Sequence, residues 1–196
     1  MDTKIKFLGV DIGGAHLKLV GLNQRKQIIY VSYLKCPIWE DLNNLKFHLF
    51  NLRNEINFNS ILCCITMTAE LCDCFENRSH GVKRIVSICK ESGLNYLFFS
   101  SKLNYFTNKF LPNHVSSMNW LAPAIFLKKK IENGILIDLG STTTDITIIK
   151  HSNLINKTMI SKVEFYIFCI DHEYGISDVR LLNKPWRSSH ESRSIS

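Results

Sequence analysis

The chain has 196 residues, of which 45% are hydrophobic and 21% charged, a composition that provides enough apolar material for one full globular core. The net charge of +7 would suit nucleic-acid binding, but the excess lies mainly at a predicted helix end, 128–130, and in the C-terminal tail, so we expect no nucleic-acid partner. The apolar runs are far shorter than the roughly 20 residues that cross a bilayer, and the N-terminus has no apolar leader, so we expect a cytoplasmic protein without a membrane partner.

The first 56 residues predict three strands and a helix. An apolar run at 5–10 and two strand-like segments at 16–22 and 27–34 predict a meander of hairpin-linked strands. Behind Asp41, which suits the capping position, apolar residues recur at steps of three and four as far as Ile56. This is the period of an α-helix.

Strands and helices then alternate. Buried strands are predicted at 61–67 and 96–100, and between them lies a helix at 81–92 that Gly93 ends as a C-terminal cap. A further helix is predicted at 119–131. Three strands followed by this alternation predict an α/β fold, the ribonuclease-H-like (actin-like ATPase) mixed sheet with flanking helices.

At Gly134 the strand pattern starts again. Segments 134–138 and 144–149 predict two strands joined by a turn of small residues, and 158–170 is the candidate third strand. A repeat of this length indicates a duplicated domain.

The repeat predicts a division of the chain into three parts. We expect a first ribonuclease-H-like domain at 1–132 and the start of a second copy at 133–182, incomplete because too few residues remain. The segment 183–196 is rich in serine and arginine and has no periodicity, so we expect a disordered or out-of-frame tail.

Two tight turns, one in each repeat, have the composition of phosphate-binding hairpins. Glycines and small hydroxyl residues let backbone N–H groups converge on an anion without interference from side chains. The predicted phosphate-binding residues are Gly13, Gly14, Gly140, Ser141, Thr142 and Thr143.

A carboxylate precedes each turn. Asp11 and Asp138 leave predicted buried strands there, and we expect them to hold Mg²⁺ largely through water, because this ion keeps much of its hydration shell and bridges phosphate oxygens. Lys18 adds a cation on the returning strand. We therefore count Asp11, Asp138 and Lys18 as catalytic candidates.

Several other polar residues have two interpretations. Glu70 and Asp73 follow a buried strand, where α/β sheets present their ligand crevice, and either is a candidate base or part of a capped turn. Asn119 is a substrate-site candidate or, like Ser117, a helix cap ahead of an inward-packed Trp120.

The remaining candidate site residues are His16, Asp145 and the cysteines. His16 faces the bound phosphate or is solvated on the outer side of the hairpin, and Asp145 is a further substrate-site candidate. The seven cysteines are an odd number placed largely in apolar segments, which favours free thiols over disulfides. A zinc site around 63–64 and 72–74 is the alternative, but the spacing lacks a second matching pair.

Four segments, in this order, resemble one protein family: 9–18, 66–73, 117–122 and 137–146. The family is the hydantoinase/oxoprolinase-like group of tetrahydromethanopterin-linked one-carbon-transfer proteins. It includes the furanmethanamine synthases of methanofuran biosynthesis and lies in the actin, sugar-kinase and chaperone-ATPase superfamily. The resemblance extends over about residues 5–150.

The resemblance implies a transferase of one-carbon cofactor biosynthesis. Such an enzyme joins the phenol oxygen of a glutamyl-tyramine unit to an aminomethylfuran carbon and displaces diphosphate. The implied partner is a phosphorylated or diphosphorylated small molecule and the implied cofactor is Mg²⁺. Glu70 or Asp73 would deprotonate the phenol.

Two alternatives remain open. One is an ATP-dependent hydantoinase/oxoprolinase-like or kinase-like enzyme, although the sequence contains no glycine-rich adenosine motif, which disfavours ATP as the cofactor. The other is an inactive truncated fragment of either enzyme, because homologous chains continue well beyond the family-like segment at 175–183. Oligomeric state and turnover are likewise left open by the sequence.

Overall fold

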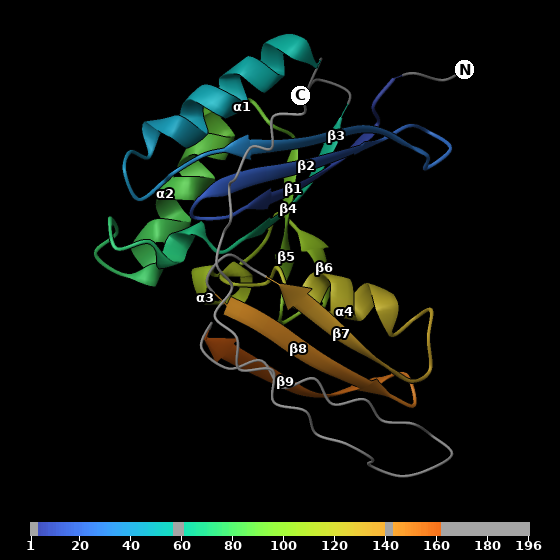
Figure 1. Cartoon of the computed structure of the whole chain (residues 1–196). Coiled ribbons are helices and arrows are strands. Elements are labelled where there is room, and N and C mark those ends of the chain that lie inside the picture. Colours follow the sequence, from blue (N-terminus) through green and yellow to red (C-terminus); the bar gives the residue numbers. More distant parts are fainter. Residues whose placement is uncertain (1–3, 57–60, 140–142, 162–196) are drawn as a thin grey trace, which may run out of the picture. The chain divides into compact units, whose positions relative to one another are not determined.

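A computed structural model describes residues 4–56, 61–139 and 143–161 (Figure 1). The chain divides into a first unit, Met1–Lys130, and a second unit, Ile131–Ser196. The predicted tail at 183–196 lies outside the described residues. None of the helices in the described ranges combines the length and the apolar character that a membrane span requires.

A six-stranded mixed sheet forms the centre of the first unit, with strand order β3-β2-β1-β4-β5-β6. Its strands β1, β3, β4 and β5 run in one direction, and β2 and β6 run in the other. This order and these directions are those of the ribonuclease-H-like fold, so the predicted fold class is confirmed. The strands are β1 Phe7–Ile12, β2 His16–Leu22, β3 Ile28–Lys35, β4 Leu62–Met67, β5 Tyr96–Ser100 and β6 Tyr105–Thr107.

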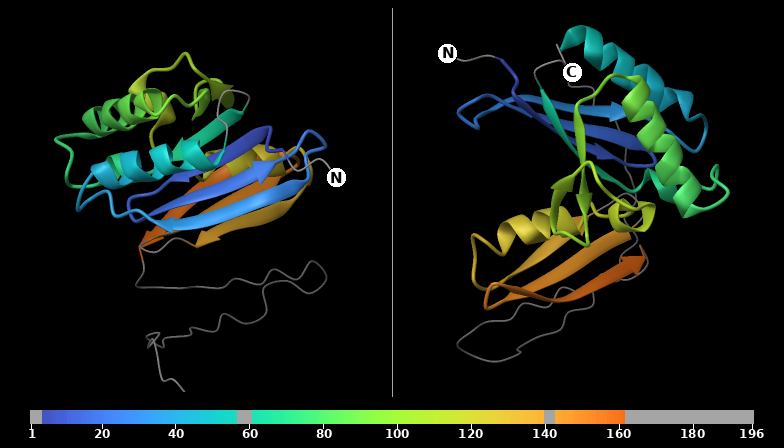
Figure 2. Two further views of the ribbon diagram at one scale, coloured as in Figure 1. Left: turned by 90° about the horizontal axis from the view of Figure 1, so that it is seen from above. Right: turned by 180° about the vertical axis from the view of Figure 1, so that it is seen from behind.

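Helices α1 (Asn43–Glu55) and α2 (Arg78–Glu91) lie on the same side of this sheet (Figures 1 and 2). Alternate residues of the strands face them, because side chains on a strand point to opposite faces in turn. The core joins residues of the strands, α1 and α2, among them Leu8, Val10, Ile12, Leu17, Leu19, Leu45, Leu49, Val82 and Ile85. The opposite face of β1 and β2 carries polar residues together with apolar ones: Asp11, His16, Lys18, Phe7, Val20 and Leu22.

The ends of α1 and α2 can be compared with the capping residues predicted from the sequence. The capping position of α1 is held by Leu42 without a side-chain cap, so the predicted cap at Asp41 is wrong, although Asp41 Oδ1 accepts the N–H of Asn43, the first residue of the helix, at 2.8 Å. Gly93 has φ +75° and follows α2, where the left-handed conformation that glycine tolerates ends a helix as predicted. The start of α2 was predicted at residue 81, but the helix begins at Arg78, because the Asn77 side chain accepts the N–H of His80 at 2.9 Å.

Three short elements of the first unit were not predicted from the sequence: the 3₁₀ helix η2 (Ala69–Leu71), which follows β4, the strand β6 and the helix α3 (Pro112–Val115). The first unit also contains α4 (Leu121–Leu127). The helix predicted at 119–131 is thus shorter than predicted, and the lysines 128–130 form turns.

The second unit contains a three-stranded antiparallel sheet in the order β7-β8-β9. Its strands are β7 Gly134–Leu139, β8 Thr143–Lys150 and β9 Asn153–Ser161. The third strand was predicted at 158–170; β9 begins earlier, at Asn153, and 162–170 lie outside the described residues. His151 and Ser152 have φ values of 49° and 57° and form a two-residue turn with both residues left-handed, so the chain returns directly after β8.

Candidate functional site

Three adjacent strands bring Asp11, Lys18 and Thr66 together. Asp11 on β1 is in register with Lys18 on β2 and with Thr66 on β4, so the three side chains share the face opposite α1 and α2. Asp11 Oδ2 lies 3.2 Å from Lys18 Nζ, and Thr66 Oγ1 donates to Asp11 Oδ1 at 2.9 Å. The side chains of Asp11 and Lys18 are 24% and 53% exposed, so the pair is open to a ligand.

The predicted catalytic candidates Asp11 and Lys18 therefore lie in contact, whereas Thr66 was missed. Thr66 stands 55 residues after Asp11, and only the parallel pairing of β1 with β4 places it there. Its hydrogen bond holds one carboxylate oxygen in place and leaves the other to the lysine. The result is an oriented carboxylate beside a cation.

The turn between β1 and β2 is shaped by close contacts at its two glycines. Neither Gly13 nor Gly14 has a positive φ, so backbone conformation does not require glycine here. A Cβ atom at Gly13 would lie 3.0 Å from the carbonyl oxygen of His16, and one at Gly14 would lie 2.9 Å from Cys72 Sγ. The glycines avoid close contacts that a side chain would make, with a backbone oxygen at Gly13 and with a side-chain sulfur at Gly14.

In the backbone of this turn the N–H of Gly13 is engaged with the His16 carbonyl at 3.0 Å, whereas the N–H groups of Gly14 and Ala15 are not bonded to the backbone of the described residues. The carbonyls of Gly14 and Ala15 accept the N–H groups of Ile38 and Cys36, each at 2.8 Å. Among the described residues, no backbone group accepts the N–H of Gly14 or of Ala15. These residues are half-buried, so water or an anion in the turn can accept the two N–H groups.

His16 stacks on Tyr33, with ring centroids 4.5 Å apart and planes inclined by 26°. Tyr33 is in register with Lys18, so the stack lies on the same face as Asp11. Tyr33 is 62% exposed. The stack was not among the two interpretations of His16 in the sequence. Tyr33 was missed because nothing but the register of β3 with β2 connects it to the site.

Glu70 and Asp73, the two candidate bases, have contrasting environments. Glu70 lies in η2 and is only 1% exposed, and its Oε1 accepts the hydroxyl of Ser117 at 2.7 Å. Burial raises the pKa of the Glu70 carboxyl above its ordinary value, partly opposed by the hydrogen bond from Ser117. Asp73 is exposed. Glu70 is thus the one with the perturbed protonation that acid–base groups show.

The segment before α4 differs from the prediction of a capped helix start. Trp120 occupies the capping position of α4 without a side-chain cap, so Ser117 and Asn119 do not cap this helix. Ser117 instead bonds Glu70, while Asn119 and Trp120 are both half-buried. The substrate-site interpretation of Asn119 stays a prediction.

In the second unit, Asp138 on β7 is in register with Asp145 on β8, so the two carboxylates lie on one face of adjacent strands. Asp145 is 9% exposed, and Asp138 is half-buried. Like charges placed opposite each other on neighbouring strands destabilise a sheet. A bound cation would relieve this repulsion. Of the predicted phosphate-binding turn, Gly140, Ser141 and Thr142 lie outside the described residues, and Thr143 begins β8.

The described residues support a magnesium site better than a zinc site. Within 4–56, 61–139 and 143–161, no group of three or more His, Cys, Asp or Glu side chains converges, so the zinc interpretation gains no support. Asp11 fits the looser demand of Mg²⁺. Each of its oxygens has a single bonded partner, and carboxylate oxygens can accept hydrogen bonds from the water molecules that this ion retains.

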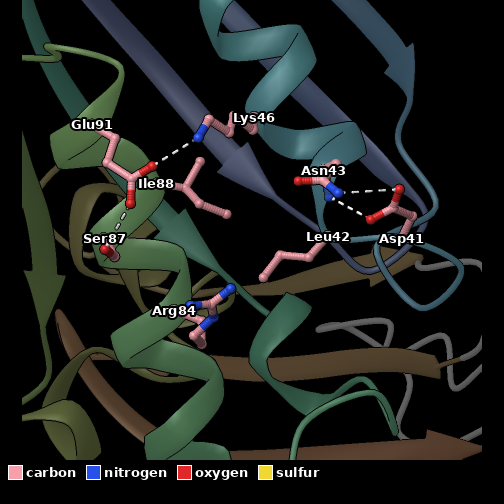
Figure 3. Close-up of a pocket in the computed structure, with 8 residues that line it drawn as sticks. All are labelled: Asp41, Leu42, Asn43, Lys46, Arg84, Ser87, Ile88 and Glu91. Atoms are coloured by element: carbon pink, nitrogen blue, oxygen red, sulfur yellow. Dashed lines mark hydrogen bonds and ion pairs between the residues drawn. The ribbon is translucent and has the colours of Figure 1, made fainter.

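A cavity of about 230 Å³ lies between the start of α1 and α2 (Figure 3). Its lining consists of Asp41, Leu42, Asn43, Lys46, Arg84, Ser87, Ile88 and Glu91, none of which is a predicted site residue. Glu91 accepts hydrogen bonds from Lys46 Nζ and Ser87 Oγ, each at 3.0 Å. These pairs are exposed, so they contribute little to stability.

Solved structures that the chain resembles include ethanolamine utilization protein EutJ from Carboxydothermus hydrogenoformans, with a TM-score of 0.47 at 16% identity over 79% of this chain and 51% of that one. The type II variant of the Ppx/GppA phosphatase from Aquifex aeolicus has a TM-score of 0.46 at 12% identity, again over 79% of this chain and 51% of that one.

Sequence comparison gives a closer relation. The chain is 32% identical over 157 residues to the (4-{4-[2-(gamma-L-glutamylamino)ethyl]phenoxymethyl}furan-2-yl)methanamine synthase of Methanocaldococcus jannaschii. The match includes 78% of this chain and 46% of the synthase, so the chain spans about half the length of this relative. The model of the hydantoinase/oxoprolinase family matches residues 63–173, more than half of the chain. The chain therefore belongs to the hydantoinase/oxoprolinase family.

Proposed function

We propose that this chain acts in the biosynthesis of a methanofuran-type one-carbon cofactor, as a transferase that forms an aryl–alkyl ether with loss of diphosphate. The observation that carries the proposal is the Asp11–Lys18–Thr66 arrangement next to a glycine turn with available N–H groups. The identity to a synthase whose named product contains a phenoxymethyl-furan group supports the choice of reaction. The proposed partner is a diphosphorylated small molecule.

The chemistry assigns a role to each of these groups. When the furan CH₂–O bond breaks, its electron pair leaves with the diphosphate, and negative charge develops on the leaving oxygen. The N–H groups of Gly14 and Ala15, together with Lys18 Nζ, would stabilise that charge, since preorganised donors act most strongly where charge develops. Thr66 would keep Asp11 oriented toward the site.

Magnesium is the proposed cofactor. Asp11 would hold a hydrated Mg²⁺ in the first unit, and Asp138, facing Asp145, is the proposed cation ligand in the second. Bound Mg²⁺ would neutralise diphosphate oxygens and so make the group a better leaving group.

The aromatic stack gives this face a surface suited to a ring-containing substrate. Tyr33 presents an exposed ring, and the ring of His16 stacks against one of its faces. Offset stacking of a furan or phenol ring on such a surface is favourable. The face therefore combines anion-binding groups with a platform for an aromatic ring.

The test is direct. Purified full chain is incubated with the glutamyl-tyramine and the aminomethylfuran diphosphate in the presence of Mg²⁺, and ether and diphosphate are quantified by mass spectrometry and a coupled phosphate assay. We expect both products in equal amounts. Lys18→Met should abolish most of the turnover, whereas Lys83→Met, which removes an exposed lysine of α2, should leave it unchanged. Absence of ether with wild-type chain would refute the proposal.

A second candidate follows from the family match at 63–173. An ATP-dependent hydantoinase/oxoprolinase-like enzyme would use a phosphate-binding turn of the same kind. Thermal melting separates the two, because a ligand stabilises the folded state that binds it. Stabilisation by diphosphate with Mg²⁺ but not by ATP favours the transferase, and the reverse favours the ATP-dependent enzyme.

A further inference from the structure

The Glu70–Ser117 pair lies at the same edge of the sheet as the glycine turn. Glu70 stands three residues beyond the end of β4. Between them, Thr68 donates its N–H to the Ile12 carbonyl at 3.0 Å, and its Oγ1 lies 3.9 Å from where a Cβ at Gly13 would stand. The segment that carries Glu70 is therefore attached to the turn that is proposed to bind diphosphate.

Glu70 is buried in a way that stability alone does not account for. Its Oε1 has the Ser117 hydroxyl as partner, but its Oε2 is shielded from solvent and has no hydrogen-bond partner in the part of the chain that the structure describes. A buried carboxyl oxygen without a partner is costly. Such a cost is typical of a group retained for chemistry.

The surroundings of Glu70 fix its position and its charge. The backbone of α2 packs directly on it, since a Cβ at Gly81 would lie 2.9 Å from both Cα and the carbonyl oxygen of Glu70. The charged group that acts on it from α2 is Arg78, and the thiol of Cys72 lies in the segment after η2. Burial outweighs the influence of Arg78 and raises the pKa of the Glu70 carboxyl, which makes it a stronger base than an exposed glutamate.

Ser117 has the strained backbone that often marks functional residues. Its φ is +55°, a left-handed conformation that is uncommon for residues other than glycine. This conformation accompanies the 2.7 Å hydrogen bond to Glu70 Oε1. Ser117 is half-buried whereas Glu70 is fully buried, so the serine hydroxyl connects the buried carboxyl to the more accessible side.

We propose that Ser117 and Glu70 form a proton relay that takes the proton of the phenol substrate, an inference that rests on the proposed ether synthesis. The Ser117 hydroxyl passes its proton to Glu70 Oε1 and receives the phenol proton in return. The phenol oxygen then forms the bond to the CH₂ carbon while the bond from that carbon to the diphosphate oxygen breaks, and the electron pair leaves with the diphosphate. Glu70 ends neutral, which its burial favours.

The relay predicts a characteristic pH dependence. Glu70 must be ionised to accept a proton, so kcat falls as pH falls through the pKa of this carboxyl. Because that pKa is raised, the loss begins at a higher pH than for an ordinary glutamate. A purely structural role of Glu70 would not produce this fall in kcat, the low-pH limb of the pH–rate profile.

Two variants test the relay without disturbing the fold. Glu70→Gln keeps the size of the side chain and an oxygen that accepts the Ser117 hydroxyl. Ser117→Gly removes the hydroxyl and suits the positive φ. We expect each to lower kcat by about 100-fold or more, the usual contribution of general base catalysis, with little change in KM for the diphosphate substrate. Glu70→Gln should also lose the low-pH limb.

Further measurements distinguish a proton relay from a purely structural role of Glu70 and Ser117. A fluorinated tyramine derivative, whose phenol is more acidic and needs less help from a base, should recover more activity in the variants than in wild type. Ser101→Ala is the control serine, since its hydroxyl bonds the His114 carbonyl and not Glu70. Unchanged kcat in folded Glu70→Gln and Ser117→Gly, or loss of the low-pH limb in Asp73→Asn instead, would overturn the relay.

An equilibrium measurement separates failure of the relay from failure of the proposed reaction. If wild-type chain makes no ether, the reaction is refuted, and the relay is judged by ¹⁹F NMR titration of a bound fluorinated tyramine. An ionised Glu70 disfavours a second negative charge nearby, so the bound phenol should ionise at a higher pH in wild type than in Glu70→Gln. Identical titrations in the two proteins would overturn the relay.

Discussion

The hairpins β1–β2 and β7–β8 both carry the repeated aspartate on an antiparallel pair of strands, but the residue opposite the aspartate has the opposite charge. In the first, Asp11 lies across from Lys18, and the pair is an ion pair at 3.2 Å. In the second, Asp138 lies across from Asp145, so two carboxylates share one face. The residue opposite the repeated aspartate thus decides whether that aspartate faces a cation or a second carboxylate. A motif that repeats in sequence need not repeat in chemistry.

Converting the first hairpin into the charge pattern of the second should have the largest effect. Lys18→Asp places a carboxylate opposite Asp11 and removes a charge-assisted contact worth about 1.5–3 kcal/mol. We expect the affinity for inorganic diphosphate, measured by calorimetry, to fall by at least about 10- to 100-fold. The Tm of the variant should at the same time rise more with added Mg²⁺ than that of wild type. Retained diphosphate affinity would contradict the assigned role of the lysine.

Displacing the first turn should have an intermediate effect. In Gly14→Ala the new Cβ meets Cys72 Sγ, and overpacking of this kind costs about 1–3 kcal/mol. We expect a value near the lower end in urea unfolding, because the sulfur is a side-chain atom that can shift, together with weaker diphosphate binding.

The double variant Gly14→Ala with Cys72→Ala provides the control for this contact. It removes the sulfur that the new methyl group meets, so the two changes should be non-additive, with the double variant recovering part of the loss. Strict additivity in the double-mutant cycle would show that the contact with Cys72 is not the cause.

Removing the repulsion in the second hairpin should have the smallest effect. Asp138→Asn keeps the shape of the side chain and relieves like charges across the strands, which are worth about 0.2–1 kcal/mol. Without Mg²⁺ we expect a slightly higher free energy of unfolding, and with Mg²⁺ a smaller gain than in wild type. Asp73→Asn, an exposed aspartate, serves as control. A variant that is less stable without Mg²⁺ would show that the two carboxylates do not repel each other.

Local signals in the sequence were enough for much of the fold. The glycine at Gly93 and the strands β1, β2 and β4 depend on neighbouring residues, and these predictions are confirmed. The third strand of the second unit was misplaced because His151 and Ser152 form its turn without the Asn-Gly or Asp-Gly signature that usually announces such turns.

The site was predictable only where its residues are close in sequence. Asp11 and Lys18 belong to one hairpin, so their motif was sufficient. Thr66 and Tyr33 reach the site through the register of β1 with β4 and of β2 with β3, and Ser117 through a hydrogen bond across 47 residues. No period or spacing in the sequence contains that information, because it is set by how the strands pair.

The carbonyl groups of Gly14 and Ala15 are bonded to the backbone of Ile38 and Cys36, which belong to the segment after β3. This segment therefore orients the turn before any ligand arrives. Ordering a loop on binding consumes part of the interaction energy, and here that ordering is completed during folding. The turn is preorganised, so more of the energy of an anion's contacts is available as affinity.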